Sequence, residues 1–181
     1  MLEAATTDRR SGFRYLDLCS VDAATRPQAR TVVLRRVDIA ARTLEFHTDT
    51  RSAKWQELGE NPYASVLGFG ADQQIQIRLQ GEIVLHRPGS SKAVEAWGQL
   101  SDWTRNTYNG GPPGDVAPLE TPDARPVSDL DNDGSGQSVF GLLLFRAAKM
   151  DWFQLQHPEN RRALFEYDAM GTLTNACWVN P

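Results

Sequence analysis

The chain has 181 residues, of which 19 are basic and 23 acidic, and its formal net charge of −4 argues against general binding to nucleic acid or anionic membranes. Hydrophobic residues make up 40% and charged residues 23%, a composition that excludes coiled-coil, collagen-like and wholly disordered chains. No apolar run reaches the roughly 18 residues of a membrane helix, and the start MLEAATTDRR has no apolar secretion segment, so we expect a cytoplasmic protein.

The two cysteines, Cys19 and Cys177, lie near opposite ends of the chain. They form no CxxC pair, and no histidine is spaced to complete a zinc site with them. We expect two buried, reduced thiols, although the spacing alone leaves one bridge between them open.

Short β-branched runs separated by turn signals fill residues 13–46 and predict three antiparallel strands. Their sequences are FRYLDLCSV, ARTVVLRRVDI and LEFHT. Trp55 and Leu58 then lie three residues apart, which predicts a helix of about two turns that ends at Gly59 and Asn61-Pro62.

The clearest strand covers residues 75–85 and alternates between apolar and polar side chains, with Gly81 interrupting the alternation. One face carries Ile75, Ile77, Leu79, Ile83 and Leu85, and the other carries Gln74, Gln76, Arg78, Gln80 and Glu82. Gly81 predicts a bulge or a sharp coil, as a closing barrel needs. A helix is expected from about Ser91, with Val94, Trp97 and Leu100 as its buried face.

Residues 110–137 hold five of the ten prolines and six acidic side chains, which predicts a long acidic loop that is mobile or covers a site. Within it, residues 129–134 copy the opening of a calcium loop, but Phe140 stands where a bidentate glutamate is needed, so we expect a solvated turn and no metal site. Two or three closing strands follow. About seven strands and two short helices predict a mainly β (α+β) fold, an antiparallel barrel formed as one domain over residues 1–181.

Three segments could carry chemistry. In Arg30–Arg35 (RTVVLR), cations flank an apolar strand; the alternative is a core strand with solvated ends, and in an unbroken strand the two arginines would face opposite ways. In Phe46–Lys54 (FHTDTRSAK), a strand enters a helix through hydroxyl and cationic residues suited to phosphate, unless Thr50 or Ser52 simply caps the helix. Gln76 offers both a donor and an acceptor to a flat heterocycle, although solvated sheet faces also carry such residues.

Together, RTVVLR, FHTDTRSAK and QIRLQG (residues 76–81) resemble the pyridoxamine 5'-phosphate oxidase-like family of FMN-binding split barrels, over about residues 15–85. The resemblance implies a split barrel that forms a homodimer with FMN at the interface, a small-molecule substrate and an oxidoreductase activity. The cofactor-binding residues that it implies are Arg30, Thr31, Val32, Val33, Leu34, Arg35, His47, Thr48, Arg51, Ser52, Lys54, Gln76, Trp152, Phe153 and Arg162. Arg35, Arg105 and Tyr108 would bind substrate.

The departures from the family pattern concern the substrate more than the flavin. Ala53 replaces a second phosphate-binding arginine, for which Arg51 could compensate, and Arg35 replaces a lysine. The Arg-x-His-x-Arg substrate signature is absent, since residues 158–162 read PENRR. Two functions therefore stay open: an FMN-dependent enzyme, or a module that binds FMN for carriage or redox sensing without turnover.

Overall fold

The computed structural model describes residues 1–116 and 135–181. Nine strands and four α-helices form there, with a short 3₁₀ helix at Ser135–Val139. The helices are α1 (Leu2–Ala5), α2 (Ala53–Glu60), α3 (Ser91–Gly98) and α4 (Asp102–Asn106). The strands are β1 (Tyr15–Val21), β2 (Pro27–Val33), β3 (Arg36–Asp38), β4 (Thr43–Asp49), β5 (Tyr63–Gly70), β6 (Ile75–His86), β7 (Phe140–Gln154), β8 (Arg161–Tyr167) and β9 (Leu173–Val179).

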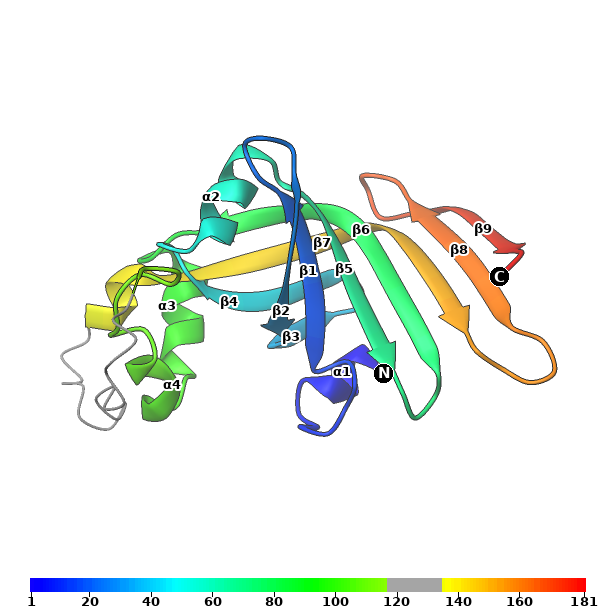
Figure 1. Cartoon of the computed structure of the whole chain (residues 1–181), viewed down its shortest axis with the longest axis horizontal. Helices are drawn as coiled ribbons and strands as arrows, with labels where there is room; N and C mark the ends of the chain where they lie inside the picture. The colour runs from blue at the N-terminus through cyan, green and yellow to red at the C-terminus, as the bar shows by residue number, and fades with distance from the viewer. Residues whose placement is uncertain (117–134) are drawn as a thin grey trace.

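The strands follow the order β2-β1-β5-β6-β7-β4-β3, and every pairing is antiparallel. The first and last strands of this path are joined in the chain by only Leu34 and Arg35. The Leu34 backbone N–H donates to the Arg14 carbonyl beside β1 (2.9 Å), and the Arg35 N–H donates to the Glu45 carbonyl of β4 (2.9 Å). This corner therefore brings the two ends of the sheet together and closes the barrel (Figure 1).

The expected alternation in β6 is confirmed. Its isoleucines and Leu79 are buried, whereas Arg78, Gln80 and Glu82 are exposed. The register of the β6–β7 pair shifts between Gln80 and Gly81, and a Cβ at Gly81 would collide with the Arg146 carbonyl. The bulge predicted at this glycine is thus present, and close backbone approach explains why a glycine occupies it.

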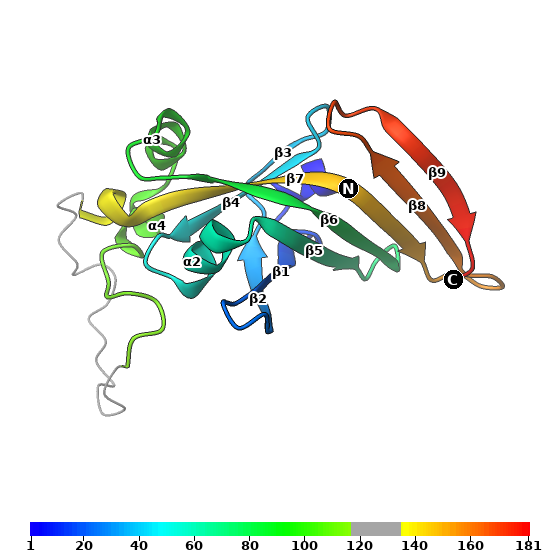
Figure 2. The same cartoon turned by 90° about the horizontal axis from the view of Figure 1, so that it is seen from above.

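The far half of β7 continues beyond the barrel and pairs with β8, which pairs with β9. Figures 1 and 2 show this hairpin extending away from the barrel, on the opposite side of the molecule from α2. Every residue of β9 except Val179 is exposed, so both faces of this strand lack cover within the described chain.

Several expectations need correction. The strand expected over residues 29–39 is broken at Leu34–Arg35, so its two halves pair with different neighbours. The described residues contain nine strands, more than the expected seven, and α1 and α4 add two one-turn helices. Val94 is 46% exposed; the buried face of α3 is Ala93, Ala96 and Trp97. Both cysteines are free, but neither is fully buried as expected: Cys19 is half-buried and Cys177 is exposed.

The calcium-like sequence at residues 129–134, and most of the predicted acidic loop, lie outside the described residues. Among the residues described, no three His, Cys, Asp or Glu side chains gather as a metal site would require. None of the described helices is long and apolar enough to cross a membrane.

Candidate functional site

A cluster of hydroxyl groups surrounds the Lys54 amine where β4 passes into α2. Thr48 and Ser52 are both 3% exposed. The Lys54 Nζ donates to Thr48 Oγ1 (3.1 Å) and to Ser52 Oγ (3.4 Å). Ser52 occupies the N-cap of α2, but its hydroxyl donates to the Asp49 carbonyl (2.6 Å) and accepts no hydrogen bond from a backbone N–H of the helix. The hydroxyls therefore do not cap the helix: they line a small basic site, which we call the Lys54 cradle (Thr48, Ser52 and Lys54).

The ammonium group of Lys54 forms no ion pair in the part of the chain that the structure describes, although the carboxylates of Asp49 and Glu57 lie near enough to raise its pKa slightly against the larger lowering effects. Burial lowers the pKa of Lys54, and the positive charge of Arg30 lowers it further. A half-buried amine held by neutral hydroxyls beside a second cation favours an anion, because an anion restores the electrostatic stabilisation that burial removes.

Arg30 lies next to this cradle but is already engaged. Its Nη2 contacts Glu57 Oε2 at 2.7 Å, and its Nη1 donates to the Ser20 hydroxyl, which in turn donates to the same carboxylate oxygen. Sequence reasoning missed both Ser20 and Glu57. The available signal was helical spacing, because Glu57 follows Lys54 by three residues and so shares its side of α2.

Arg51 does not join the cradle. Its guanidinium forms a bidentate pair with Asp49, with Nη2 at 2.7 Å from Oδ2 and Nε at 3.0 Å from Oδ1, and it also donates to the Gly110 carbonyl (2.9 Å). The hydrogen bonds to Asp49 raise the pKa of Arg51. The residue fastens the turn before α2 to the segment after α4, and in this arrangement it does not stand in for the arginine that Ala53 replaces.

The residues between Arg30 and Arg35 are mostly structural. The Thr31 hydroxyl donates to Asp17 (2.9 Å), Val32 and Leu34 are buried, and Val33 is half-buried. Because β2 ends at Val33, Arg35 lies on the corner and no longer obeys strand alternation.

Arg35 itself is half-buried, and its Nε has no hydrogen-bond partner among the described residues. Burial lowers the pKa of Arg35, and the charge of Arg14 contributes to the lowering. The Arg35 guanidinium is therefore, like the Lys54 ammonium group, a partly buried cation that can still accept a ligand as hydrogen-bond partner.

His47 projects from the outer face of β4. Its Nε2 lies 3.1 Å from Glu45 Oε1, its ring packs edge-on against Phe140 at 5.0 Å, and its Nδ1 is buried without a partner in the described chain. Tyr108 packs against the same Phe140 ring at 5.2 Å, and burial raises the pKa of Tyr108 to about 12. Tyr108 is thus a neutral aromatic neighbour of Arg35.

Arg105 has mainly local partners. It donates to the carbonyls of Trp97 (3.3 Å) and Gly98 (3.0 Å), which links α4 to the end of α3. The structure does not bring Arg105 into the Lys54 cradle.

The remaining predicted residues lie at the far end of β7. Gln76 is paired with Phe153, and Phe153 with Arg162. Arg162 holds the buried Asp151 with two hydrogen bonds (3.0 and 2.8 Å), and the hydrogen bonds from Arg162 are the main reason that the pKa of Asp151 is lowered. The neighbouring Trp152 packs against Trp178 on β9, with ring centroids 6.3 Å apart.

This second group is remote from the first within one chain. His47 pairs with Leu142 and Gln76 with Phe153, so the two groups are separated by eleven residues along β7, or about 35 Å of extended strand. The structure therefore brings together Arg30, Thr48, Ser52 and Lys54 in one place, and Gln76, Phe153 and Arg162 in another.

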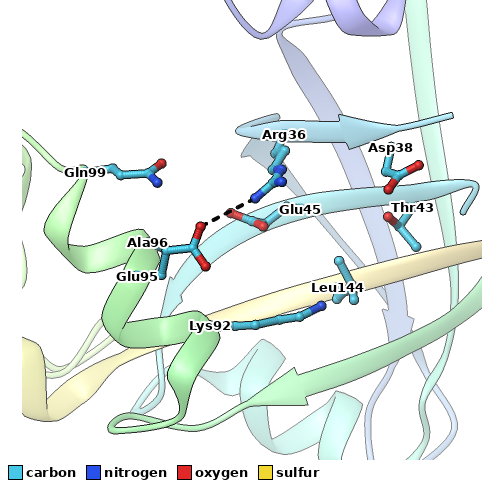
Figure 3. Close-up of a pocket in the computed structure, with 9 residues that line it drawn as sticks. All are labelled: Arg36, Asp38, Thr43, Glu45, Lys92, Glu95, Ala96, Gln99 and Leu144. Atoms are coloured by element: carbon cyan, nitrogen blue, oxygen red, sulfur yellow. Dashed lines mark ion pairs between the residues drawn. The ribbon is translucent and has the colours of Figure 1, made fainter. Parts of the chain in front are cut away.

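A separate polar groove lies between α3 and the β3–β4 hairpin (Figure 3). Arg36 and Lys92 line it together with the acidic residues Asp38, Glu45 and Glu95. The Arg36–Glu95 pair spans the groove at 3.9 Å, and both side chains are largely exposed. Three carboxylates outnumber the two cations here, so this groove shows no preference for an anion.

Residues 1–87 match the family model described as pyridoxamine 5'-phosphate oxidase, FMN-binding domain. Over 177 residues the chain is 29% identical to pyridoxine/pyridoxamine 5'-phosphate oxidase 2 of Arabidopsis thaliana, which covers 92% of this chain and 87% of that protein. It is 38% identical over 81 residues to the pyridoxine/pyridoxamine 5'-phosphate oxidase of Paraburkholderia phymatum, a match that covers 45% of this chain and only 37% of the bacterial protein.

Two solved structures share the whole fold. A pyridoxamine 5'-phosphate oxidase-related FMN-binding protein of Nostoc punctiforme superposes with a TM-score of 0.80 at 24% identity, covering 99% of this chain and 94% of that one. PhzG of Burkholderia lata, solved with tetrahydrophenazine-1-carboxylic acid, gives a TM-score of 0.77 at 18% identity, covering 99% and 88%. The fold, the matched FMN-binding domain and the relatives agree with the expected resemblance: over residues 1–87 the chain is similar to the pyridoxamine 5'-phosphate oxidase FMN-binding domain, and its whole fold is that of FMN-binding split barrels.

Proposed function

We propose that this chain is an FMN-dependent oxidoreductase that acts on a small organic substrate. The observation that carries the proposal is the Lys54 cradle, where a half-buried ammonium group is held only by hydroxyls and lies near a second cation. The residues present fit the terminal phosphate of FMN, because hydroxyl and ammonium donors are the groups that bind phosphate oxygens.

Arg30 adds positive charge beside the cradle while Glu57 and Ser20 hold it in place. Glu57 would orient the Arg30 guanidinium rather than neutralise the whole site, since Lys54 has no such partner in the described chain. The segment from Thr31 in β2 to Leu34 at the barrel corner would then lie along the flavin ring, with Arg35 at its end.

We also propose that two copies of the chain complete each site. Gln76 and Phe153, with Arg162 opposite Phe153, are about 35 Å along β7 from His47, the residue before the Lys54 cradle, and one FMN molecule does not span that distance. If these residues also contact the cofactor, they do so on a partner chain. The projecting β8–β9 hairpin, with β9 exposed on both faces, is the part of the described chain that lacks cover.

When bound, FMN supplies a ring that accepts two electrons as a hydride and passes them to oxygen or another acceptor. The protein supplies position and charge. The Gln76 amide can donate to and accept from the ring edge, and the Arg35 guanidinium stabilises negative charge that develops near it.

Titration of the purified protein with FMN tests the cofactor assignment. We expect Lys54→Ala and Arg30→Ala each to weaken binding by about 10- to 150-fold, the equivalent of a charge-assisted contact of about 1.5 to 3 kcal/mol. Lys149→Ala is the matched control, because Lys149 pairs with Glu166 on the β7–β8 sheet. Unchanged flavin retention in both site variants would contradict the assignment.

Size-exclusion chromatography with light scattering tests the dimer, and a protein that stays monomeric with bound FMN would refute it. Anaerobic mixing of the FMN-loaded protein with pyridoxamine phosphate or with NADH separates the enzyme from a module that only binds FMN. Bleaching of the flavin absorption within seconds supports the enzyme, and no bleaching with either donor favours the binding module.

A further inference from the structure

A buried carboxylate, that of Glu57 on α2, lies beside the cations at the Lys54 cradle. Glu57 is only 9% exposed, and Ser20, which faces it from β1, is 5% exposed. The Glu57 Oε2 atom lies 2.7 Å from Arg30 Nη2 and accepts a hydrogen bond from the Ser20 hydroxyl (2.6 Å). These contacts fix the carboxylate within the site and keep it from turning toward solvent.

Few charged groups surround this carboxylate. Those that face Glu57 in the described chain are Arg30 from β2 and Lys54 from its own helix. The strands packed against α2 are β1 and β6. From β1 the uncharged Ser20 reaches the carboxylate, and β6 places the apolar Leu85 beside the helix. Three side chains, Glu57, Arg30 and Lys54, therefore set the charge of this site.

The site carries one positive charge in excess. Arg30 and Lys54 supply two positive charges, and Glu57 supplies one negative charge. The carboxylate of Asp49 also lies near Lys54, but it is paired with Arg51 at 2.7 Å, and that pair adds no net charge. A ligand with a single negative charge therefore matches the site.

The terminal phosphate of FMN has two charge states near neutral pH. A phosphate monoester has its second pKa at about 6, so at pH 8 the free cofactor carries almost entirely the dianion. In this site the dianion would leave one negative charge uncompensated beside the buried Glu57 carboxylate. Such a charge is costly, because a partly buried site solvates it poorly. The monoanion avoids this cost.

We propose that the buried Glu57 carboxylate links FMN binding to the uptake of a proton: the phosphate binds as the monoanion, and at pH 8 one proton moves from solution onto a phosphate oxygen. This inference rests on the proposed function, to which it adds the protonation state of the cofactor that the site selects. Glu57 is then a specificity-determining residue. FMN should be held more tightly as the pH falls toward 6, and below that the affinity should level off because free FMN is already the monoanion.

Isothermal titration calorimetry of the FMN-free protein counts the protons. FMN is titrated at pH 8 in HEPES and in Tris, since the difference in observed heat between buffers of unlike ionisation enthalpy gives the number taken up. We expect about one proton per FMN and a dissociation constant that rises about tenfold from pH 7 to pH 8. Riboflavin, which lacks the phosphate, should bind without proton uptake. No uptake with FMN, or equal uptake with riboflavin, would overturn the proposal.

The ³¹P NMR spectrum of bound FMN at pH 8 locates the proton. We expect the chemical shift of a phosphate monoanion. A dianion shift would overturn the proposal, because the proton would then reside on Lys54 or Glu57 instead of on the phosphate.

The variant Glu57→Gln removes the negative charge with little change in shape. The contacts with Arg30 and Ser20 both end on Oε2, so the glutamine carbonyl oxygen can keep them. We expect proton uptake to disappear and FMN to bind about tenfold more tightly at pH 8, because the dianion then meets two uncompensated cations. Glu60→Gln, at an exposed position of the same helix, is the matched control and should keep the uptake. Undiminished uptake in Glu57→Gln would overturn the proposal.

Ser20→Ala separates the charge of Glu57 from its placement. This variant loses the hydrogen bond to Glu57 but keeps every charge, so FMN binding should weaken while the uptake of one proton remains. Loss of the uptake in Ser20→Ala would contradict the assignment to charge. FMN that fails to bind at any pH refutes the proposed function and this inference with it, whereas FMN that binds without proton uptake refutes this inference alone.

Discussion

Replacing Lys54 with methionine tests two effects of the Lys54 charge separately: its cost to the stability of the FMN-free protein and its contribution to FMN binding. Methionine keeps much of the length of the side chain but removes the charge, which lies half-buried, beside Arg30 and without an ion pair in the described chain. We expect the free energy of unfolding of the FMN-free protein to rise by about 1 kcal/mol, because an uncompensated, partly buried charge is removed. The measurement is urea denaturation followed by tryptophan fluorescence.

The same variant should bind FMN more weakly. The lost contact is a charge-assisted one of about 1.5 to 3 kcal/mol, so the dissociation constant should rise about 10- to 150-fold. Lys92→Met, at an exposed lysine of α3, controls for the loss of one positive charge. A variant that is less stable without FMN, yet binds FMN within twofold of the parent, would refute the reasoning about the cradle.

Three further substitutions test the fold around the site by urea denaturation. Gly81→Val should lower the free energy of unfolding by about 1 to 3 kcal/mol, since its side chain would collide with a β7 carbonyl at the bulge; an unchanged midpoint would show that the strands can separate there. Leu34→Ala should lower the free energy of unfolding by about 2 to 5 kcal/mol, because Leu34 is fully buried at the barrel corner. A smaller loss than for an exposed leucine would contradict that role. Asp151→Asn should lower the free energy of unfolding by about 2 kcal/mol, because Arg78 and Arg162 lose the carboxylate that they share; the partial exposure of both arginines keeps the loss this small.

The Asp151 contribution should also depend on pH. The hydrogen bonds and charges of Arg162 and Arg78 hold its pKa below the ordinary value of 3.8 in the folded protein. The stabilisation is therefore complete above about pH 5 and is lost as the pH falls through 3.8 and then through the lower folded-state pKa. The difference in unfolding free energy between the parent protein and Asp151→Asn should shrink over that range; a constant difference would show that the carboxylate charge contributes nothing.

The periodic parts of the fold could be predicted from the sequence. The alternation of β6 and the glycine within it gave the strand, its faces and the bulge, because burial on one face of an antiparallel sheet imposes a period of two. The break at Leu34–Arg35 could not be predicted in this way. An apolar, β-branched run reads as one strand, and only the long-range pairing of its two halves with β1 and β4 shows the corner.

In the candidate site, too, local contacts could be predicted from the sequence and long-range contacts could not. Thr48, Ser52 and Lys54 are close in the chain, so local spacing was enough to predict that they meet. The partners of Arg30 come from β1 and α2, and those of Asp151 from β6 and β8, and such contacts depend on tertiary packing rather than on sequence separation. The α3 helix shows the limit of periodicity: Val94, Trp97 and Leu100 suggested one face, but small alanines at 93 and 96 allow close packing and turn Val94 outward.

The fifteen residues of β7 set the distance between the two groups of candidate site residues. One end of this strand neighbours the Lys54 cradle and the other carries Phe153 opposite Arg162, so its length fixes how far apart the two groups stand. Deleting one residue would reverse which side chains face inward along the remainder of the strand. Deleting two would preserve the facing but shorten the spacing by about 7 Å. A change of two residues in this strand therefore keeps the inward-facing side chains, whereas a change of one residue needs a compensating bulge, and either change alters the spacing between the two groups.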